Sequence, residues 1–360
     1  MNKGGRMMIS QIRKIINKLK GQKAADSEIF CSQEEEIEIL NMLAKQNIYP
    51  FNYSETDKKG KELLEFIVTF LEKILKYINQ SVNKEKQKKF CFLFVNDHSI
   101  NAFATRYKDI DIVALNIGVA KSLYDYFNKV IDSEVFPEIG EDIEKKKDLV
   151  FDLQIFAIMY ILFHEIAHIY NGHFGYDNTY YYRMLDYENH RKELDNKTIE
   201  MDADAFAMTQ SYVLIENLIK VREQTPKSYN LRDYSYSTLM FAIYSFYLFF
   251  EEEVVNSDIL HLDSYFPRRI RQALNMDIIE NIIEKDHPEY VSKIEEINSL
   301  TIIKGEKCWE KYSNKPLNIL EILSLQNEAV VKDIDKVFNN WNKIYDKLEP
   351  HARLPLASKR

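Results

Sequence analysis

Three residues on one predicted helix have the types and the spacing of a catalytic zinc site. The segment Leu162–His168 reads LFHEIAH, which places His164 and His168 four positions apart with Glu165 between them. On an α-helix such side chains share a face about one turn apart, so both imidazoles can reach one metal ion. Glu165 projects beside them, where a carboxylate can take a proton from a metal-bound water. The pattern predicts hydrolysis by zinc-activated water, with Glu165 as the general base.

This pattern is uncommon by chance. The chain has 8 His and 56 Asp or Glu among its 360 residues, so a His-acid-x-x-His sequence is expected about 0.03 times in a chain of this composition. The motif also lies within a strongly apolar stretch, where polar side chains without partners would be costly to bury. A metal site explains both observations better than two unrelated histidines on a helix.

The motif helix does not supply the third zinc ligand. A catalytic zinc site takes three protein ligands and leaves a further position open. Metzincins place a histidine six residues after the second motif histidine, but that position is Phe174, and His173 comes one residue too early. His173 could contact substrate or could be a polar residue that ends the helix, and we favour the second interpretation.

The next predicted helix carries a better candidate in Ile199–Ala205, IEMDADA. Glu200 and Asp204 share a face of this helix at i and i+4. Glu200 can therefore bind zinc while Asp204 accepts a hydrogen bond from a ligand imidazole. Asp202 is expected to point elsewhere, into solvent. We predict Glu200 as the third ligand and Asp204 as the residue that supports the site.

These residues need a fold that holds two helices together over a sheet. Hydrophobic periodicity and the scarcity of Gly and Pro predict three short strands among long helices. The strands are predicted at 90–95, 101–107 and 110–115, and the helices at 33–45, 61–80, 119–131, 149–171, 197–222 and 237–255, with a helical pattern over 268–349 broken near Pro288, Gly305 and Pro316. A charged loop is predicted over 138–148. The fold class is α+β and predominantly α-helical, with a small sheet packed on the motif helix.

The same patterns divide the chain into three regions. We predict an N-terminal helical region over 1–89, a core over 90–275 that carries the candidate site, and a C-terminal helical region over 276–360. Residues 9–20 combine apolar and basic positions at helical spacing and could touch a membrane surface. A partly ordered terminal helix is the commoner explanation of such a segment.

Composition narrows the class of protein. The formal net charge of −8 argues against a nucleic-acid partner, because phosphate binding needs a basic surface. Three cysteines without a CxxC pair and the lack of a signal-peptide pattern favour a reducing compartment, the cytoplasm. The apolar runs Ile155–Phe163 and Leu239–Phe250 are shorter than the roughly 20 residues of a membrane-spanning helix. We therefore expect buried core helices and no transmembrane segment.

Several segments together resemble a known group of enzymes. The pairing of HEIAH with EMDAD is similar to the pattern of gluzincin zinc metallopeptidases. Asn101–Thr105 (NAFAT), Ile112–Gly118 (IVALNIG) and His168–His173 (HIYNGH) resemble segments around the motif helix of HtpX-like peptidases. A chain with this motif order and no predicted transmembrane helix most resembles the Lit-like phage-exclusion peptidases, over about 95–275. The resemblance implies a protein substrate inside the cell and a role in phage defence.

The resemblance also suggests a further catalytic residue. The segment that ends at His261, with Arg268, Arg269 and Arg271 beyond it, resembles a stretched form of another HtpX-like segment. We expect His261 to stabilise the negative charge that develops on the carbonyl oxygen in the transition state. One of the arginines could orient His261 or bind substrate. The alternative to an enzyme is a regulatory or toxin-type binding protein that keeps the gluzincin scaffold with little proteolysis.

Overall fold

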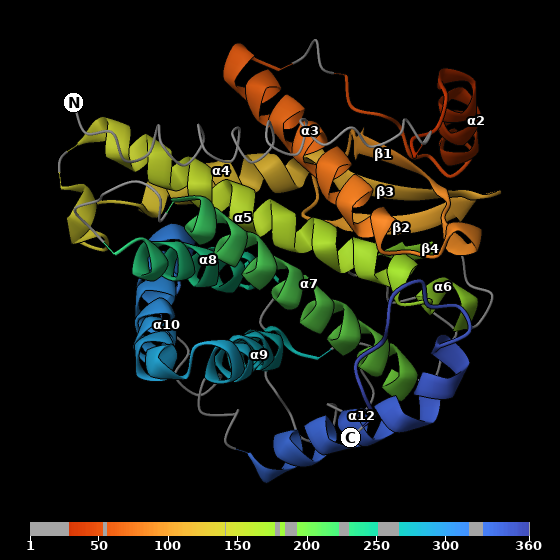
Figure 1. Cartoon of the computed structure of the whole chain (residues 1–360). Coiled ribbons are helices and arrows are strands. Elements are labelled where there is room, and N and C mark those ends of the chain that lie inside the picture. The colour runs from red at the N-terminus through yellow and green to blue at the C-terminus, as the bar shows by residue number, and fades with distance from the viewer. Residues whose placement is uncertain are drawn as a thin grey trace.

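The protein is a helical bundle built around a small sheet (Figure 1). The computed structural model describes residues 29–52, 56–140, 142–176, 181–183, 193–222, 230–250, 266–316 and 327–359. The longer helices are α2 (Gln33–Ala44), α3 (Lys58–Gln80), α4 (Ile117–Val130), α5 (Ile143–Tyr170), α7 (Glu193–Arg222), α8 (Leu231–Tyr247), α9 (Arg268–Asp286), α10 (Val291–Ser313) and α12 (Glu328–Leu348). The strands are β1 (Lys89–Val95), β2 (Ala102–Tyr107), β3 (Ile110–Asn116) and β4 (Tyr181–Arg183). The predicted α+β, mainly helical class is confirmed.

The sheet has the order β1-β3-β2-β4. Strand β3 runs parallel to β1 and antiparallel to β2, and β4 pairs antiparallel with β2. Alternate residues of each strand face opposite sides, as the two-residue period of a strand requires. Ile110, Ile112 and Ala114 pack with residues of α2 on one side. Val113 and Leu115 belong to the main core on the other side, which includes α3 and α5.

Helix α5 is the centre of the molecule. It packs against β2, α4, α7 and α8, and Figure 1 shows it between the sheet and α7. Nearly every residue from Leu149 to Tyr170 is buried. The segment Ile143–Tyr176 is long and apolar enough to cross a membrane, but 94% of its most apolar window is buried inside the protein. Such burial is what a core helix shows, and the motif is therefore held on the most enclosed element of the fold.

Some predicted boundaries were wrong. Helix α5 begins at Ile143 rather than 149, because Asp142 caps it by accepting hydrogen bonds from the backbone amides of Glu144 and Lys145. The predicted break near Gly305 is absent, since α10 continues through it. A side chain at Gly305 would meet the ring of Tyr244 on α8, so this glycine allows two helices to approach closely. The break near Pro288 is confirmed, between α9 and α10.

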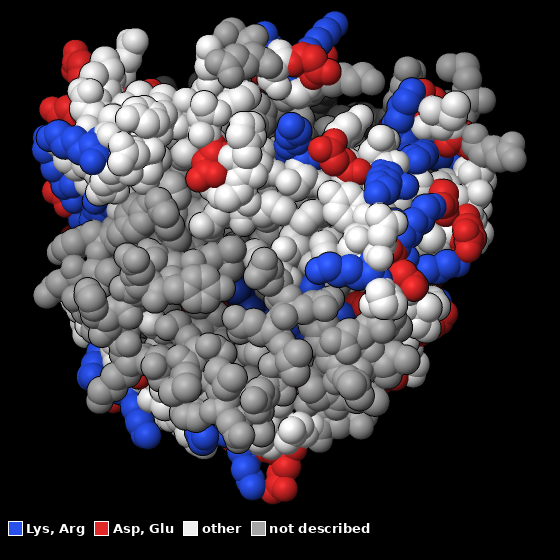
Figure 2. Space-filling model, turned by 180° about the vertical axis from the view of Figure 1, so that it is seen from behind, with Lys and Arg blue, Asp and Glu red and all other residues white. Residues whose placement is uncertain are grey.

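Charged residues of both signs share the surface. On the face seen in Figure 2, the Lys and Arg side chains of the described residues are interspersed with Asp and Glu rather than gathered in one basic field. Binding to nucleic acid needs clustered positive charge. The expectation that nucleic acid is not a partner stays a prediction, as does the membrane contact weighed for residues 9–20, which lie outside the described residues.

Gly118 offers a test of the packing between the sheet and α4. It lies in the first turn of α4, and a methyl group there would overlap the backbone carbonyls of His98 and Ser99. We expect Gly118→Ala to lower the free energy of unfolding by about 1–3 kcal/mol, the usual cost of overpacking. Denaturant unfolding measures this change, with Lys121→Ala on the exposed face of the same helix as the control. An unchanged free energy would show that the loop at His98 yields freely.

Candidate metal centre

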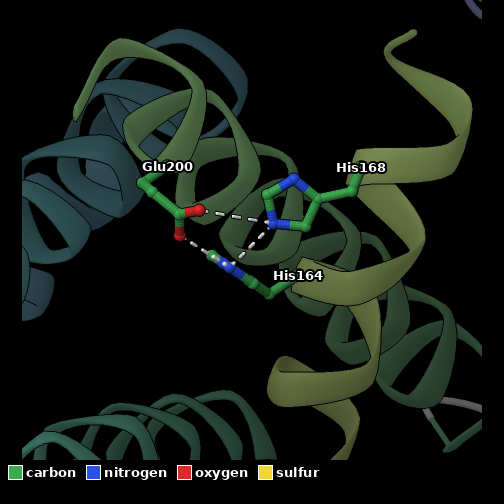
Figure 3. Close-up of side chains that lie close together, drawn as sticks. All are labelled: His164, His168 and Glu200. Atoms are coloured by element: carbon green, nitrogen blue, oxygen red, sulfur yellow. Dashed lines mark hydrogen bonds and ion pairs between the residues drawn. The ribbon is translucent and has the colours of Figure 1, made fainter. Parts of the chain in front are cut away.

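Three buried side chains from two helices converge on one point (Figure 3). His164 and His168 come from α5, and Glu200 comes from α7. The Nε2 atoms of the two histidines are 3.2 Å apart. The Oε2 atom of Glu200 lies 3.1 Å from His164 Nε2, and its Oε1 atom lies 3.7 Å from His168 Nε2. Residues 164, 168 and 200 can thus present one ligand atom each to a single ion.

The spacing of these atoms fits a zinc ion. Ligands bound tetrahedrally at 2.0–2.1 Å lie roughly 3.3 Å from one another, close to the 3.2 Å between the two Nε2 atoms and the 3.1 Å between His164 Nε2 and Glu200 Oε2. The Oε2 atom of Glu200 is buried and has no hydrogen-bond partner among the residues that the structure describes. Small residues of α7, Ala203 and Ala207, are fully buried and allow the helix to approach its neighbours. The donor set and its spacing therefore suit a metal ion.

Hydrogen bonding at the far side of His164 decides which nitrogen faces the other ligands. His164 Nδ1 lies 2.8 Å from Oδ1 of Asp204. An ionised carboxylate can only accept, so Nδ1 carries the proton and the neutral ring presents its Nε2 lone pair. Burial acts to lower the pKa of His164, but Asp204 and Glu200 outweigh it and raise the pKa to about 10. The two carboxylates therefore favour a cation at this point, either a proton or a metal ion.

His168 is supported by a longer chain of contacts. Its Nδ1 lies 2.9 Å from Nδ1 of His173, at the start of the short helix α6 (His173–Tyr176), and His173 Nε2 lies 3.0 Å from Oδ2 of Asp202. Asn171 donates to the same oxygen at 2.6 Å. When His173 donates to Asp202 from Nε2, its Nδ1 can accept from Nδ1 of His168, and His168 Nε2 then carries a lone pair. In that tautomer two lone pairs face each other across 3.2 Å, an arrangement that a cation between them stabilises.

Two sequence-based expectations were wrong here. Asp202 was expected in solvent, but only 7% of it is exposed, and it accepts hydrogen bonds. For His173 a helix-ending role was favoured over a substrate contact, but it is fully buried against His168. The reason is the turn at Gly172, whose φ of +81° ends α5 and places His173 against His168.

Glu165 is placed to accept a proton. The residue is fully buried, and neither carboxylate oxygen has a hydrogen bond of good geometry to the residues that the structure describes. Burial raises the pKa of Glu165 to about 8, helped by the charge of Glu200 and opposed by His164, Arg271 and the backbone amide of Ala104. A general base works best when its pKa lies near the operating pH. The environment of Glu165 is of this kind.

Arg271 holds Asp204 in place. Its Nε and Nη2 atoms donate to the two oxygens of Asp204 at 2.7 Å each, and the hydroxyl of Tyr247 donates to the same carboxylate at 3.0 Å. Burial alone would raise the pKa of Asp204, but Arg271 and His164 hold it well below its usual range. Asp204 therefore stays ionised and keeps its hold on His164.

The family model for Peptidase U49 matches residues 77–275, more than half of the chain. The chain belongs to the Peptidase U49 family. No curated protein and no solved structure matches it. Membership makes proteins the substrate class of this U49 peptidase, and the matched segment contains all the residues that converge at the candidate centre.

The other predicted site residues fare differently. His261 lies outside the described residues. The three arginines after it were expected to orient it or to bind substrate, but each is buried and already bonded within the protein. Arg268 donates to the carbonyl oxygen of Leu248, Arg269 pairs with Glu306, and Arg271 pairs with Asp204. Sequence reasoning noticed Arg271 but did not find its partner, which belongs to a helix nearly seventy residues away.

A substitution at Asp202 tests whether this residue supports the candidate metal centre or is only part of a solvated helix face. In the structure it orients His173, which in turn orients His168. Removing such a support usually weakens metal affinity about 10–100-fold. We expect Asp202→Ala to lower zinc affinity by at least about tenfold, measured by competition with a chelator. Equal affinity in the wild type and the variant would return Asp202 to the passive role expected from the sequence. Asp195→Ala, on the same helix but bonded to Tyr176 and Asn340, serves as the control.

Proposed function

We propose that this U49 peptidase is a zinc-dependent endopeptidase. The observation that carries the proposal is the convergence of His164, His168 and Glu200 at separations that suit one tetrahedral ion. Zinc, when bound, would lower the pKa of a water molecule and polarise the scissile carbonyl. The set of ligand atoms, two imidazole nitrogens and one carboxylate oxygen, supports zinc over calcium or magnesium, which prefer sets of oxygen ligands.

The protein's own residues divide the remaining work. Glu165 is the neighbour of His164 in the sequence and is fully buried beside the candidate ligands, so it can take the proton of the attacking water and pass it to the leaving amine. Asp204 holds His164 in one orientation, and Arg271 holds Asp204. His173 and Asp202 do the same for His168. The site is thereby fixed before substrate arrives, as efficient catalysis requires.

The substrate is proposed to be a protein of the cytoplasm in which this chain resides. Support comes from the peptidase family and from the acidic, cysteine-poor sequence. The resemblance to phage-exclusion peptidases suggests that the substrate is cut during phage infection. This choice of substrate and compartment rests on that resemblance.

The proposal is tested by metal analysis and by a search for new protein termini. The protein should purify with about one zinc per chain, and cells that express the wild type should gain termini that cells with Glu165→Gln lack. A chain that rejects zinc, or equal sets of termini in both cultures, would favour a binding protein on this scaffold instead.

We also propose that His261 stabilises the transition state from outside the zinc ligands. Loss of one donor to a developing oxyanion costs about 10²–10³ in kcat. His261→Ala should show that fall with zinc content and KM unchanged, in steady-state kinetics on the identified substrate. An unchanged kcat would make His261 a packing residue.

A further inference from the structure

A second pocket lies at the carboxyl end of α5 and has a different chemistry. Its volume is about 220 Å³, below the roughly 300–1,000 Å³ of pockets that hold drug-sized ligands. Four Lys and Arg side chains and one histidine line it against a single acid, Glu85. The cationic side chains are those of Lys86, Lys88, Arg106 and Arg353, and the histidine is His351. The pocket is therefore small and rich in positive charge.

The two arginines of the pocket, Arg106 and Arg353, share one buried carboxylate. Arg106 Nε lies 2.8 Å from Oδ1 of Asp111, and Arg353 Nη2 lies 2.5 Å from Oδ2 of the same residue. Asp111 is fully buried. One negative charge thus faces two guanidinium groups, which leaves a positive charge uncompensated by Asp111.

Arg353 has a hydrogen-bonding group without a partner in the described part of the chain. Its side chain is only 4% exposed, and its Nη1 atom is buried with no hydrogen-bond partner among those residues. Leaving such a donor unsatisfied away from water costs free energy, more so for a charged group. An acceptor that reached Nη1 from the pocket would remove that cost, and a guanidinium prefers an acceptor with two oxygens, such as phosphate.

Lys86 adds charge to the same pocket. Its Nζ donates to the backbone carbonyl of Ala352 at 2.6 Å, a bond that positions the ammonium group without neutralising it. Lys88 is paired with Asp109 at 2.6 Å, but that aspartate is 92% exposed. An exposed pair of this kind holds weakly, so Lys88 is available to a ligand.

The pocket is built by close backbone packing. Gly172 and Gly175, which follow α5, leave no room for a side chain against residues 348–352. The backbone amide of Arg353 donates to the carbonyl of Tyr170 at 2.7 Å. These contacts fix Arg353 beside Arg106, although the two are far apart in the sequence. The arrangement does not depend on flexible surface side chains alone.

We propose that this pocket binds a phosphate-type oxyanion, either inorganic phosphate or the phosphate group of a small metabolite. The guanidinium nitrogens of Arg353 and Arg106 that do not face Asp111 would donate to the oxygens of the bound anion. Lys86 would add its positive charge. The site is separate from the candidate metal centre but adjoins α6. Phe174 lines the pocket under the guanidinium of Arg106, and its neighbour His173 contacts His168.

Calorimetric titration of the full-length protein tests this proposal. Potassium phosphate is titrated against potassium chloride of equal ionic strength, and adenosine monophosphate forms a second arm. Saturable binding of phosphate, weakened at least tenfold by Arg353→Gln, is the expected result. Tighter binding of adenosine monophosphate would support a metabolite, and tighter binding of phosphate would support the free ion.

Controls separate this site from folding effects and from the metal. Arg232→Gln also removes a partly buried arginine with a carboxylate partner, Glu216, and should bind phosphate as the wild type does. If Arg353→Gln fails to fold, Lys86→Gln on the pocket rim should show the same weakening. The proposal would be overturned if phosphate showed no saturable binding. It would also be overturned if the pocket variants bound phosphate as the wild type does, which is the result expected for phosphate held at a metal ion.

Discussion

Replacing Glu165 by glutamine should abolish peptide hydrolysis and leave the zinc content unchanged. Glutamine has nearly the volume of glutamate, so it fills the same buried position without disturbing the packing. It cannot accept the proton of the attacking water. We therefore expect kcat to fall by at least about 10²-fold, the scale of general acid–base catalysis.

The measurement combines turnover, zinc content and thermal unfolding of the same preparations. Glu216→Gln is a matched control, because Glu216 is a buried glutamate too, although it lies on α7. It is hydrogen-bonded to Tyr236 and Arg232 and not to the candidate ligands. That variant should keep its turnover. Near-normal turnover in Glu165→Gln would remove Glu165 from the mechanism, whatever the metal.

Local spacing explains why so much of the centre could be predicted from the sequence. The i and i+4 relation fixes which side chains share a helix face, so both helical pairs, at 164 and 168 and at 200 and 204, were foreseeable once the helices were. The small, fully buried side chain of Ala203 allows α7 to lie close to its neighbours. The structure brings the three expected ligands together, and zinc binding by them stays a prediction.

Contacts between distant segments could not be predicted in this way. The role of His173 depends on the turn at Gly172, and the role of Arg271 depends on how α9 packs against α7. Neither follows from periodicity within one helix. Gly305 was misjudged for the same reason. Glycine usually weakens a helix, but here it lets α10 pack closely against Tyr244 of α8, a contact that the local sequence does not reveal. A glycine and a histidine just after the motif helix were the available signals for the network at His168.

Removing the carboxylate of Glu200 should empty the metal centre, whereas removing that of Asp204 should only weaken it. Glu200 offers oxygens at 3.1 and 3.7 Å from the two imidazole nitrogens, so Glu200→Ala takes away one of three ligands. Asp204 contacts the opposite nitrogen of His164, so Asp204→Ala leaves all three ligands in place. We expect zinc to be lost from the first variant and bound about 10–100-fold more weakly by the second.

Zinc affinity by chelator competition and zinc content after dialysis distinguish these outcomes. Asp204→Ala also leaves Arg271 buried without its carboxylate, a change that costs stability as well as affinity. Asp204→Asn keeps one acceptor for His164 and is the variant to read if Asp204→Ala unfolds. His173→Ala completes the set, because His173 Nδ1 lies 2.9 Å from the imidazole of His168. If His173→Ala empties the centre while Glu200→Ala retains zinc, the third ligand has been assigned to the wrong helix.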